Sequence, residues 1–228
     1  MGAGRRRPVL HRRDEPGHRA GPGLGAQRKA LSASERDEAA RAAWRAPATG
    51  LDPAACGRVD ESGSHLGLTR ASARAPRGQR AGGRAPRNRG RIRTTVAALT
   101  PDGLGPGLVR EGGVSARAFA VYVEAALVPT PRPGRVVMLD HLRQHRSPRG
   151  RALIEARGAE LWSPPPYSPD LNPIAEACSK VKALLRAAAR THDALVAAIR
   201  AALRAITPAD ARGYITHAGY PHPPAQAA

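Results

Sequence analysis

The stretch RVVMLD, residues 135–140, is the clearest predicted β-strand in this chain. It is an unbroken apolar run that follows a Pro-Gly turn and ends in an acid, which is typical of a buried strand. Residues 147–158 are predicted to form the next helix, with Pro148 in its first turn and Gly158 just past its end. Residues 159–162 form another short strand. The middle of the chain therefore has the order strand, helix, strand.

Further elements are predicted before this unit. The strands are residues 54–60, 94–100 and 106–112. A helix over residues 116–128 begins after the capping residue Ser115 and repeats its apolar residues at i, i+3 and i+4. An earlier helix, residues 35–46, starts near Ser34 and Asp37 and is anchored by Trp44. This order of elements indicates the α/β class, with helices on the faces of a mixed sheet.

The C-terminal third is predicted to be helical. Its first helix carries one apolar stripe, made of Ile174, Ala177, Cys178, Val181, Leu184, Leu185 and Ala188. Thr191 and Thr207 cap the second and third helices, which form an extension of the domain. The chain is thereby divided into five segments. They are a disordered basic segment (1–27), a linking helix (28–49), the α/β domain (50–190), the C-terminal helices (191–220) and a disordered tail (221–228).

Charge is the strongest feature of the composition. The 228 residues carry a formal net charge of +19, nearly all of it from arginine, and such a basic chain most often binds a polyanion such as nucleic acid. The alternative is that a GC-rich genome encodes many arginines whatever the function of the protein. Composition alone does not separate nucleic-acid binding from this genomic bias. The segment from Arg70 to Arg93, both ends included, contains nine arginines and no acid. They either grip DNA phosphates or form a solvated basic loop.

Several classes are excluded. No apolar run approaches the roughly 18 residues that a membrane span needs. No apolar segment follows Arg5–Arg7, as it would in a secretory signal. The two cysteines, Cys56 and Cys178, lack a metal-binding spacing and are interpreted as small buried apolar residues. We therefore expect a cytoplasmic protein with no membrane partner.

Two acids stand at the predicted ends of strands, Asp60 and Asp140. Functional groups of α/β sheets gather at the C-terminal ends of strands, and carboxylates are preferred ligands of Mg²⁺. Two such ions about 4 Å apart drive in-line attack on a phosphodiester. The alternative is that each aspartate only caps a turn.

Several ordered motifs resemble those of bacterial insertion-sequence transposases of the mariner-like superfamily. These are PPYSPDLNPI (165–174) followed by SKVK (179–182), VDESG (59–63), ARAPRGQR (73–80), TTVAALT (94–100), RPGRVVMLDHLRQH (132–145) and DARGYITHAGY (210–220). The resemblance covers roughly residues 28–220. It implies a DDE enzyme with a ribonuclease H-like fold, an endonuclease that cuts and joins DNA in transposition, a form of DNA recombination and integration.

The resemblance also assigns the site. Asp60 and Asp140 fall on the first two acids of the triad, with Mg²⁺ or Mn²⁺ as the cofactor, two ions in an active enzyme. The third acid, directly after Asn-Pro-Ile, is replaced by Ala175, and Glu176 comes one position late. One position is about 100° of helical rotation. We therefore expect impaired catalysis. The alternatives are an active enzyme with Glu176 as its third catalytic and metal ligand, and a basic nucleic-acid-binding remnant without metal chemistry.

The implied partners are transposon-end and target DNA, and a homodimer is one assembly that the resemblance allows. Candidate DNA contacts are Arg74, Arg77, Arg80, Arg84, Arg87, Lys180 and Lys182. The helix-turn-helix region of the family has no counterpart in this sequence, so we expect a chain truncated before that module. Tyr167 and Asp170 are predicted to hold the proline turn together, through aromatic packing and an Asx-type hydrogen bond.

Overall fold

A mixed sheet lies at the centre of the computed structural model, which describes residues 32–70, 73–105, 107–127, 134–140, 147–187 and 191–221. Among the described residues the sheet has six strands, in the order β3-β2-β1-β5-β6, with β4 also paired to β2. The strands are β1 (Cys56–Ser64), β2 (Arg93–Thr100), β3 (Gly103–Leu104), β4 (Leu108–Glu111), β5 (Val136–Leu139) and β6 (Glu160–Trp162). The ends predicted to be disordered are 1–27 and 221–228, and all of their residues except Pro221 lie outside the described residues.

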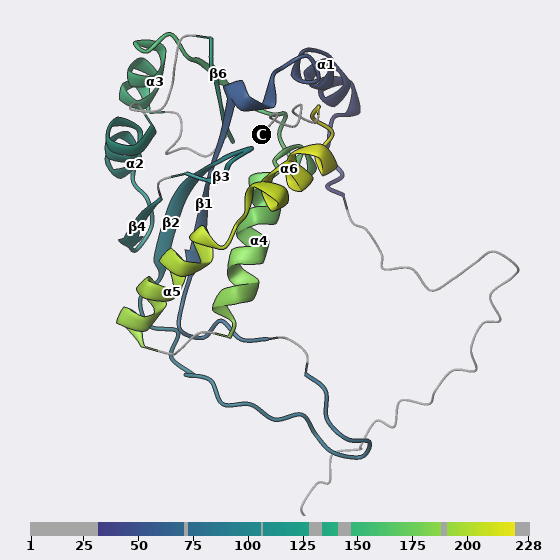
Figure 1. The fold of residues 1–228 in the computed structure, drawn as a ribbon, viewed down its shortest axis with the longest axis vertical. Coiled ribbons are helices and arrows are strands. Elements are labelled where there is room, and N and C mark those ends of the chain that lie inside the picture. Colours follow the sequence, from purple (N-terminus) through teal and green to yellow (C-terminus); the bar gives the residue numbers. More distant parts are fainter. Residues whose placement is uncertain are drawn as a thin grey trace, which may run out of the picture. The chain divides into compact units, whose positions relative to one another are not determined.

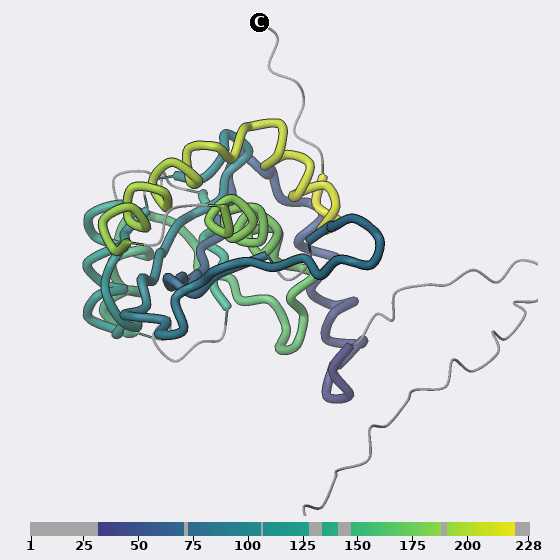
Figure 2. The backbone as a smooth tube through the Cα atoms, turned by 90° about the horizontal axis from the view of Figure 1, so that it is seen from below, coloured from purple at the N-terminus to yellow at the C-terminus, as the bar shows by residue number. Residues whose placement is uncertain are grey.

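Helices cover both faces of the sheet (Figure 1). They are α1 (Glu38–Ala48), α2 (Ala116–Tyr122, continued by the π-helical turn Val123–Leu127), α3 (Pro148–Glu155), α4 (Ile174–Leu185), α5 (His192–Arg204) and α6 (Pro208–His217). Helices α2 and α3 lie on one face, and α4 lies on the other beneath α5 and α6 (Figure 2). The expected α/β class, a mixed sheet flanked by helices with a helical C-terminal extension, is confirmed.

Burial on both faces explains why the sequence of strand β5 is an unbroken apolar run. Val136 and Met138 contribute to the core beneath α4, α5 and α6, whereas Val137 and Leu139 contribute to the core beneath α2 and α3. Because a parallel strand in the centre of a sheet is covered on both faces, every one of its side chains is buried. The alternation places residues 136, 138 and 140 on the α4 side.

Local capping signals place most helix starts correctly. The side chains of Ser115, Ser147, Thr191 and Thr207 each accept a hydrogen bond from a backbone N–H three residues on, as expected of N-caps. In α1 the cap is Asp37 rather than Ser34, and the helix therefore begins at Glu38. No helix among the described residues combines the length and apolar character required to cross a bilayer.

The first strand differs from its prediction. The expected strand 54–60 ended at Asp60, but β1 continues to Ser64, so Asp60 lies inside it. The extension forms because residues 61–64 pair with β2, with Glu61 opposite Val96 and Ser64 opposite Arg93. The short strand β3 was not predicted. It forms because Gly103 and Leu104 pair with the end of β2.

Candidate active site

Asp60 and Asp140 are brought together by the parallel pairing of β1 and β5. The register places Arg58 opposite Met138 and Val59 opposite Leu139. Continued by one residue, it places Asp60 opposite Asp140, on strands about 5 Å apart. Both residues fall on the α4 side of the sheet. The Oδ1 atom of Asp60 accepts a hydrogen bond of 2.7 Å from the backbone N–H of Glu61.

A cleft of about 380 Å³ opens above these two aspartates. Its wall is the proline turn that leads from β6 into α4. The cleft is lined by Asp60, Asp140, Pro164, Pro165, Pro166, Tyr167, Ser168, Pro169, Asn172 and Ala175. Two carboxylates therefore face a largely apolar wall, with the start of α4 beside them.

The first turn of α4 presents Ala175, not Glu176, to the cleft. The Oε1 atom of Glu176 lies 2.6 Å from the Nδ1 atom of His217 in α6, so this carboxylate faces away from the aspartates. The two neighbours thus lie on opposite flanks of α4, as a rotation of about 100° per residue requires. The position that borders both aspartates has a methyl group.

The pKa of His217 is expected to exceed its ordinary value of 6.5, because the Glu176 carboxylate accepts its hydrogen bond. A raised histidine pKa contributes stability below the unfolded value and loses it as the pH rises through the folded value. This link between α4 and α6 is therefore strongest while His217 is protonated and Glu176 is ionised, and it weakens as the pH rises through the folded pKa of His217. An NMR titration of the His217 ring should show a lower midpoint in Glu176→Gln than in the wild type. Equal midpoints would contradict the link.

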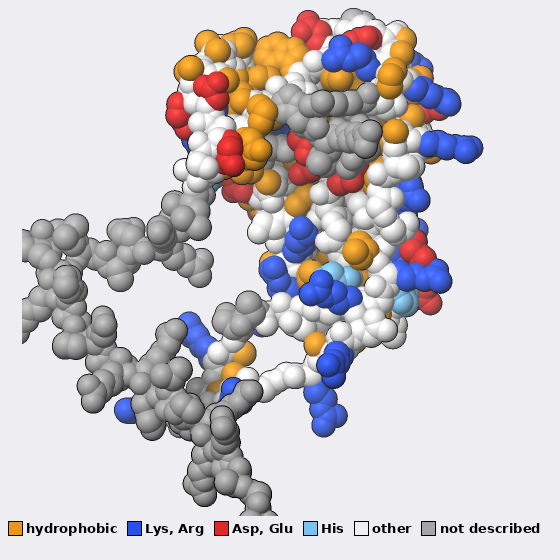
Figure 3. Space-filling view, turned by 180° about the vertical axis from the view of Figure 1, so that it is seen from behind, with side chains coloured by type: hydrophobic (Ala, Val, Ile, Leu, Met, Phe, Trp, Pro, Cys, Tyr) orange, Lys and Arg blue, Asp and Glu red, His pale blue; other side chains and the backbone are white. Residues whose placement is uncertain are grey.

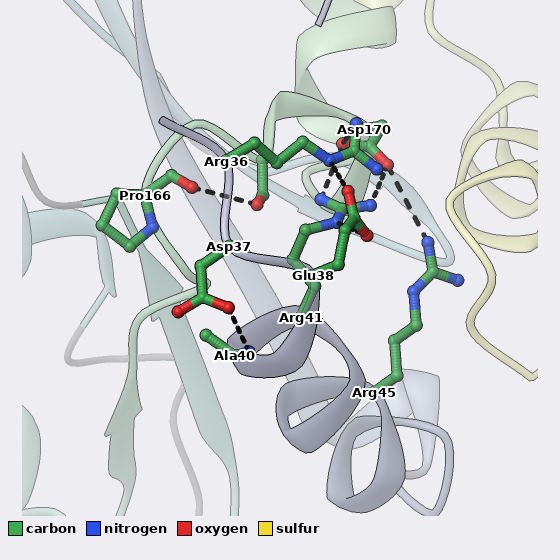
Figure 4. A network of polar contacts seen from close by, with 9 residues as sticks. Arg36, Asp37, Glu38, Ala40, Arg41, Arg45, Pro166 and Asp170 are labelled. Atoms are coloured by element: carbon green, nitrogen blue, oxygen red, sulfur yellow. Dashed lines mark hydrogen bonds and ion pairs between the residues drawn. The ribbon is translucent and has the colours of Figure 1, made fainter. Parts of the chain in front are cut away.

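Asp170 in the proline turn is held by α1 and the residues before it (Figure 4). Arg41, whose side chain is 2% exposed, donates to both carboxylate oxygens of Asp170, at 3.0 and 2.6 Å. Arg36 and Arg45 each lie 3.8 Å away. The Arg41 guanidinium holds the pKa of Asp170 below its usual range. The predicted Asx-type hydrogen bond is thus replaced by an ion pair between segments 129 residues apart.

Tyr220, from the C-terminal segment, braces the same turn from the other side. Its hydroxyl donates a buried hydrogen bond of 2.8 Å to the carbonyl oxygen of Leu171. Its ring lies 4.4 Å from the guanidinium carbon of Arg58, two residues before Asp60. Because the guanidinium lies over the ring, the contact is a cation–π contact rather than a hydrogen bond. Sequence reasoning missed this brace and the arginines around Asp170, since no local pattern marks either.

The thiol of Cys178 lies near Asp60, one turn beyond Ala175 on α4. Burial first, and then the charge of Asp60, raise the pKa of the Cys178 thiol to about 11. The thiol is therefore protonated at neutral pH. Cys56 is buried, as predicted, whereas Cys178 is half-buried.

The predicted DNA contacts fall into two groups. Arg74, Arg77, Arg80, Arg84 and Arg87 are all exposed on the long connection between β1 and β2. The ammonium group of Lys180 instead lies 2.6 Å from a carboxylate oxygen of Asp210, which joins α4 to α6 and lowers the pKa of Asp210 to about 2. Lys182 is half-buried near Cys178. Lysine and arginine side chains spread along one border and the lower end of the face in Figure 3.

The two carboxylates of the cleft are suitable ligands for a divalent ion. Mg²⁺ is commonly held by one or two carboxylates together with water, which Asp60 and Asp140 provide. Ala175, which lines the same cleft, adds no oxygen ligand to these two carboxylates. No group of three or more histidines, cysteines, aspartates or glutamates suited to a metal occurs in the described part of the chain.

Comparison with known proteins shows the family and the fold. A family model of the DDE superfamily endonucleases matches residues 58–196, which is more than half of the chain. No curated protein matches the sequence.

Solved structures of the Mos1 mariner transposase share the fold. The paired-end complex with Mn superposes with a TM-score of 0.65 at 16% identity, over 86% of this chain and 63% of that chain. The strand transfer complex gives 0.65 at 17% identity, over 86% and 64%. The catalytic domain with raltegravir and Mg gives 0.57 at 14% identity, over 82% and 90%. The chain thus spans less than two thirds of the Mos1 chains in those two complexes.

The sheet order, the paired aspartates beside the proline turn and the family match lead to one assignment. The protein belongs to the DDE superfamily endonucleases and has the ribonuclease H-like fold of the mariner transposase catalytic domain.

Proposed function

We propose that this chain is a transposase catalytic domain that binds DNA and a divalent ion but is impaired in cleavage and strand transfer. The observation that carries the proposal is the lining of the cleft, where Asp60 and Asp140 lie beside Ala175 and not beside Glu176. The domain in this proposal is residues 50–190, with residues 191–220 as its helical extension.

Asp60 and Asp140 are the residues that would hold Mg²⁺ or Mn²⁺. A divalent ion at such a site supplies Lewis-acid activation of water and of a phosphodiester. The backbone N–H of Glu61 orients the Asp60 carboxylate, and the prolines of the wall restrict water on one side of the cleft. Ala175 adds neither charge nor a ligand atom, so the step that needs a third carboxylate is the one that fails.

The proposed nucleic-acid partner is DNA, both the transposon ends and the target. The proposed protein partner is a second copy of this chain, in a homodimer. Mos1 has been solved as a pre-cleavage transpososome and as a strand transfer complex. The exposed arginines between β1 and β2 supply phosphate contacts here, because each neutralised phosphate releases counterions and adds salt-dependent affinity. Lys182 is retained as a contact. Lys180 contributes only if DNA displaces Asp210.

Mn²⁺ binding tests the metal part of this proposal directly. The free Mn²⁺ signal in electron paramagnetic resonance, measured during titration, should reveal a site in the wild-type protein. Asp140→Asn, which removes one ligand charge, should weaken that site by at least about tenfold. Asp102→Asn is the matched control, because Asp102 is exposed on the β2–β3 turn and does not line the cleft.

Two results would overturn parts of the proposal. Unchanged Mn²⁺ affinity in an Asp60→Asn, Asp140→Asn double variant would rule out the proposed metal site. The remaining interpretation would then be a basic DNA-binding remnant without metal chemistry. Loss of Mn²⁺ affinity in Glu176→Gln equal to that in Asp140→Asn would make Glu176 the third ligand. That outcome requires Glu176 to leave His217, so the Glu176→Gln effect should then be larger at high pH than at low pH.

A further inference from the structure

Tyr167 combines two features that rarely occur together. Its φ angle of 57° is the one positive value found at a non-glycine residue in the described part of the chain. The residue is also 57% exposed, although tyrosine is among the larger apolar residues of this protein. A bulky residue in the left-handed region costs conformational free energy, and exposure of the ring recovers none of it through burial.

The neighbouring residues enforce this backbone conformation. The Ser168 hydroxyl donates to the carbonyl oxygen of Pro166 at 3.1 Å, which closes the turn around Tyr167. Beyond it, Asp170 is fixed by Arg41, and Leu171 is fixed by the Tyr220 hydroxyl. The predicted role of Tyr167, holding the turn together by aromatic packing, is not supported, because other side chains hold the turn and Tyr167 is more than half exposed.

The ring stands at the lip of the cleft that contains the two aspartates. The residues before it, Pro164 to Pro166, make an apolar wall, while Asp60 and Asp140 supply the negative charge. A nucleotide has the same two kinds of surface. The face of its base is apolar, and its phosphate is an anion that binds an acidic site only through a bridging cation. A base inside an intact duplex is stacked on both faces, so away from the duplex ends an unpaired base is the one that offers a face to the ring.

We propose that Tyr167 is a stacking platform for an unpaired DNA base, and that it holds the adjoining phosphate beside Asp60 and Asp140. This inference rests on the proposed function, since it takes DNA as the ligand of the cleft. Stacking of a base on an aromatic side chain contributes about 1–3 kcal/mol by alanine substitution, which corresponds to about 5- to 150-fold in affinity. In this proposal the strained backbone conformation at Tyr167 serves to present the ring to the DNA base.

The test compares two DNA probes on the full chain. One is a short duplex with a single-stranded extension that carries a fluorescent purine analogue, and the other is the same duplex with blunt ends. The wild-type protein should quench the analogue and bind the extended probe more tightly than the blunt one. Tyr167→Phe, which keeps the ring, should preserve both effects. Tyr167→Asn, which tolerates the left-handed conformation but lacks the ring, should lose quenching and about 5- to 150-fold of the affinity for the extended probe.

Stability separates this role from a structural one. Because the ring is not packed, the Tm of Tyr167→Asn should equal or exceed that of the wild type, whereas loss of a packed ring would lower it. A lower Tm, or equal loss of affinity for both probes, would overturn the stacking role. If the wild type fails to bind even the blunt duplex, the proposed function itself fails. If it binds the blunt duplex and Tyr167→Asn changes nothing, only the inference about Tyr167 is wrong.

Discussion

Replacing Ala175 with glutamate should raise the Mn²⁺-dependent nicking of supercoiled plasmid DNA by about 100-fold or more. Ala175 borders the same cleft as Asp60 and Asp140, so a carboxylate at this position adds the oxygen ligands that the site lacks. The magnitude follows from the steep dependence of catalysis on ligand position, where a displacement of about 1 Å already costs about 100-fold in rate. The rate of conversion from supercoiled to open-circular plasmid measures the effect.

Two controls isolate the charge at this position. Ala175→Gln adds nearly the same volume without a carboxylate and should stay at the wild-type rate. The double variant Ala175→Glu, Asp140→Ala should lose the gained activity, because one of the two original acids is gone. An Ala175→Glu protein no faster than Ala175→Gln would contradict the view that the missing carboxylate limits this chain. Wild-type nicking that vanishes in Asp140→Ala would refute the impaired state itself.

The Arg58→Met protein should be more stable than the wild type by about 1–4 kcal/mol. Arg58 lies within β1 at 0% exposure, and its three side-chain nitrogens find no hydrogen-bond acceptor among the described residues. Burial lowers the pKa of Arg58, which is the signature of a charge placed where water does not reach it. Its cation–π contact with Tyr220 offsets only about 2 kcal/mol of that desolvation cost. Methionine fills a similar volume without a charge.

Denaturant unfolding and thermal melts measure this change. For a chain of this size, each kcal/mol corresponds to a Tm shift of about 2–4 °C. Arg58→Ala provides a comparison, because it removes the charge but leaves a cavity and should gain less. A fall in stability for Arg58→Met would show that the contact with Tyr220 outweighs the desolvation of the guanidinium.

Arg41→Met is the matched control, because the Arg41 side chain is also closed to solvent, at 2% exposed, but is paired with Asp170. Its loss should destabilise the protein by about 1–3 kcal/mol, at the lower end because the Asp170 side chain is 46% exposed and its charge is partly screened. Since the pKa of Asp170 is lowered, this stabilisation is present above the ordinary value of 3.8 and is lost as the pH falls through the folded value. The same substitution at two buried arginines should therefore have opposite signs.

Much of the fold followed from local sequence. The apolar run in β5 predicted a buried strand, the caps Ser115, Thr191 and Thr207 marked the starts of α2, α5 and α6, and Pro148 marked the first turn of α3. These signals work because they depend on residues within one or two turns of each other. Asp140 was placed at the end of its strand for the same reason. The absence of a carboxylate at position 175 is likewise a property of the sequence alone.

Partnerships between distant segments decided the rest. The sequence predicted that β1 stops at Asp60, but pairing of residues 61–64 with β2 extends it. Nothing local indicated that Arg41 would hold Asp170, that His217 would hold Glu176 or that Asp210 would hold Lys180. Each pair joins segments that are far apart in the chain and meet only in the folded protein. The sequence by itself therefore determined which residues are available for a site and which helix or strand carries each of them. The tertiary structure decided that Ala175 faces the cleft and Glu176 does not, because the direction of each side chain depends on how α4 packs on β1.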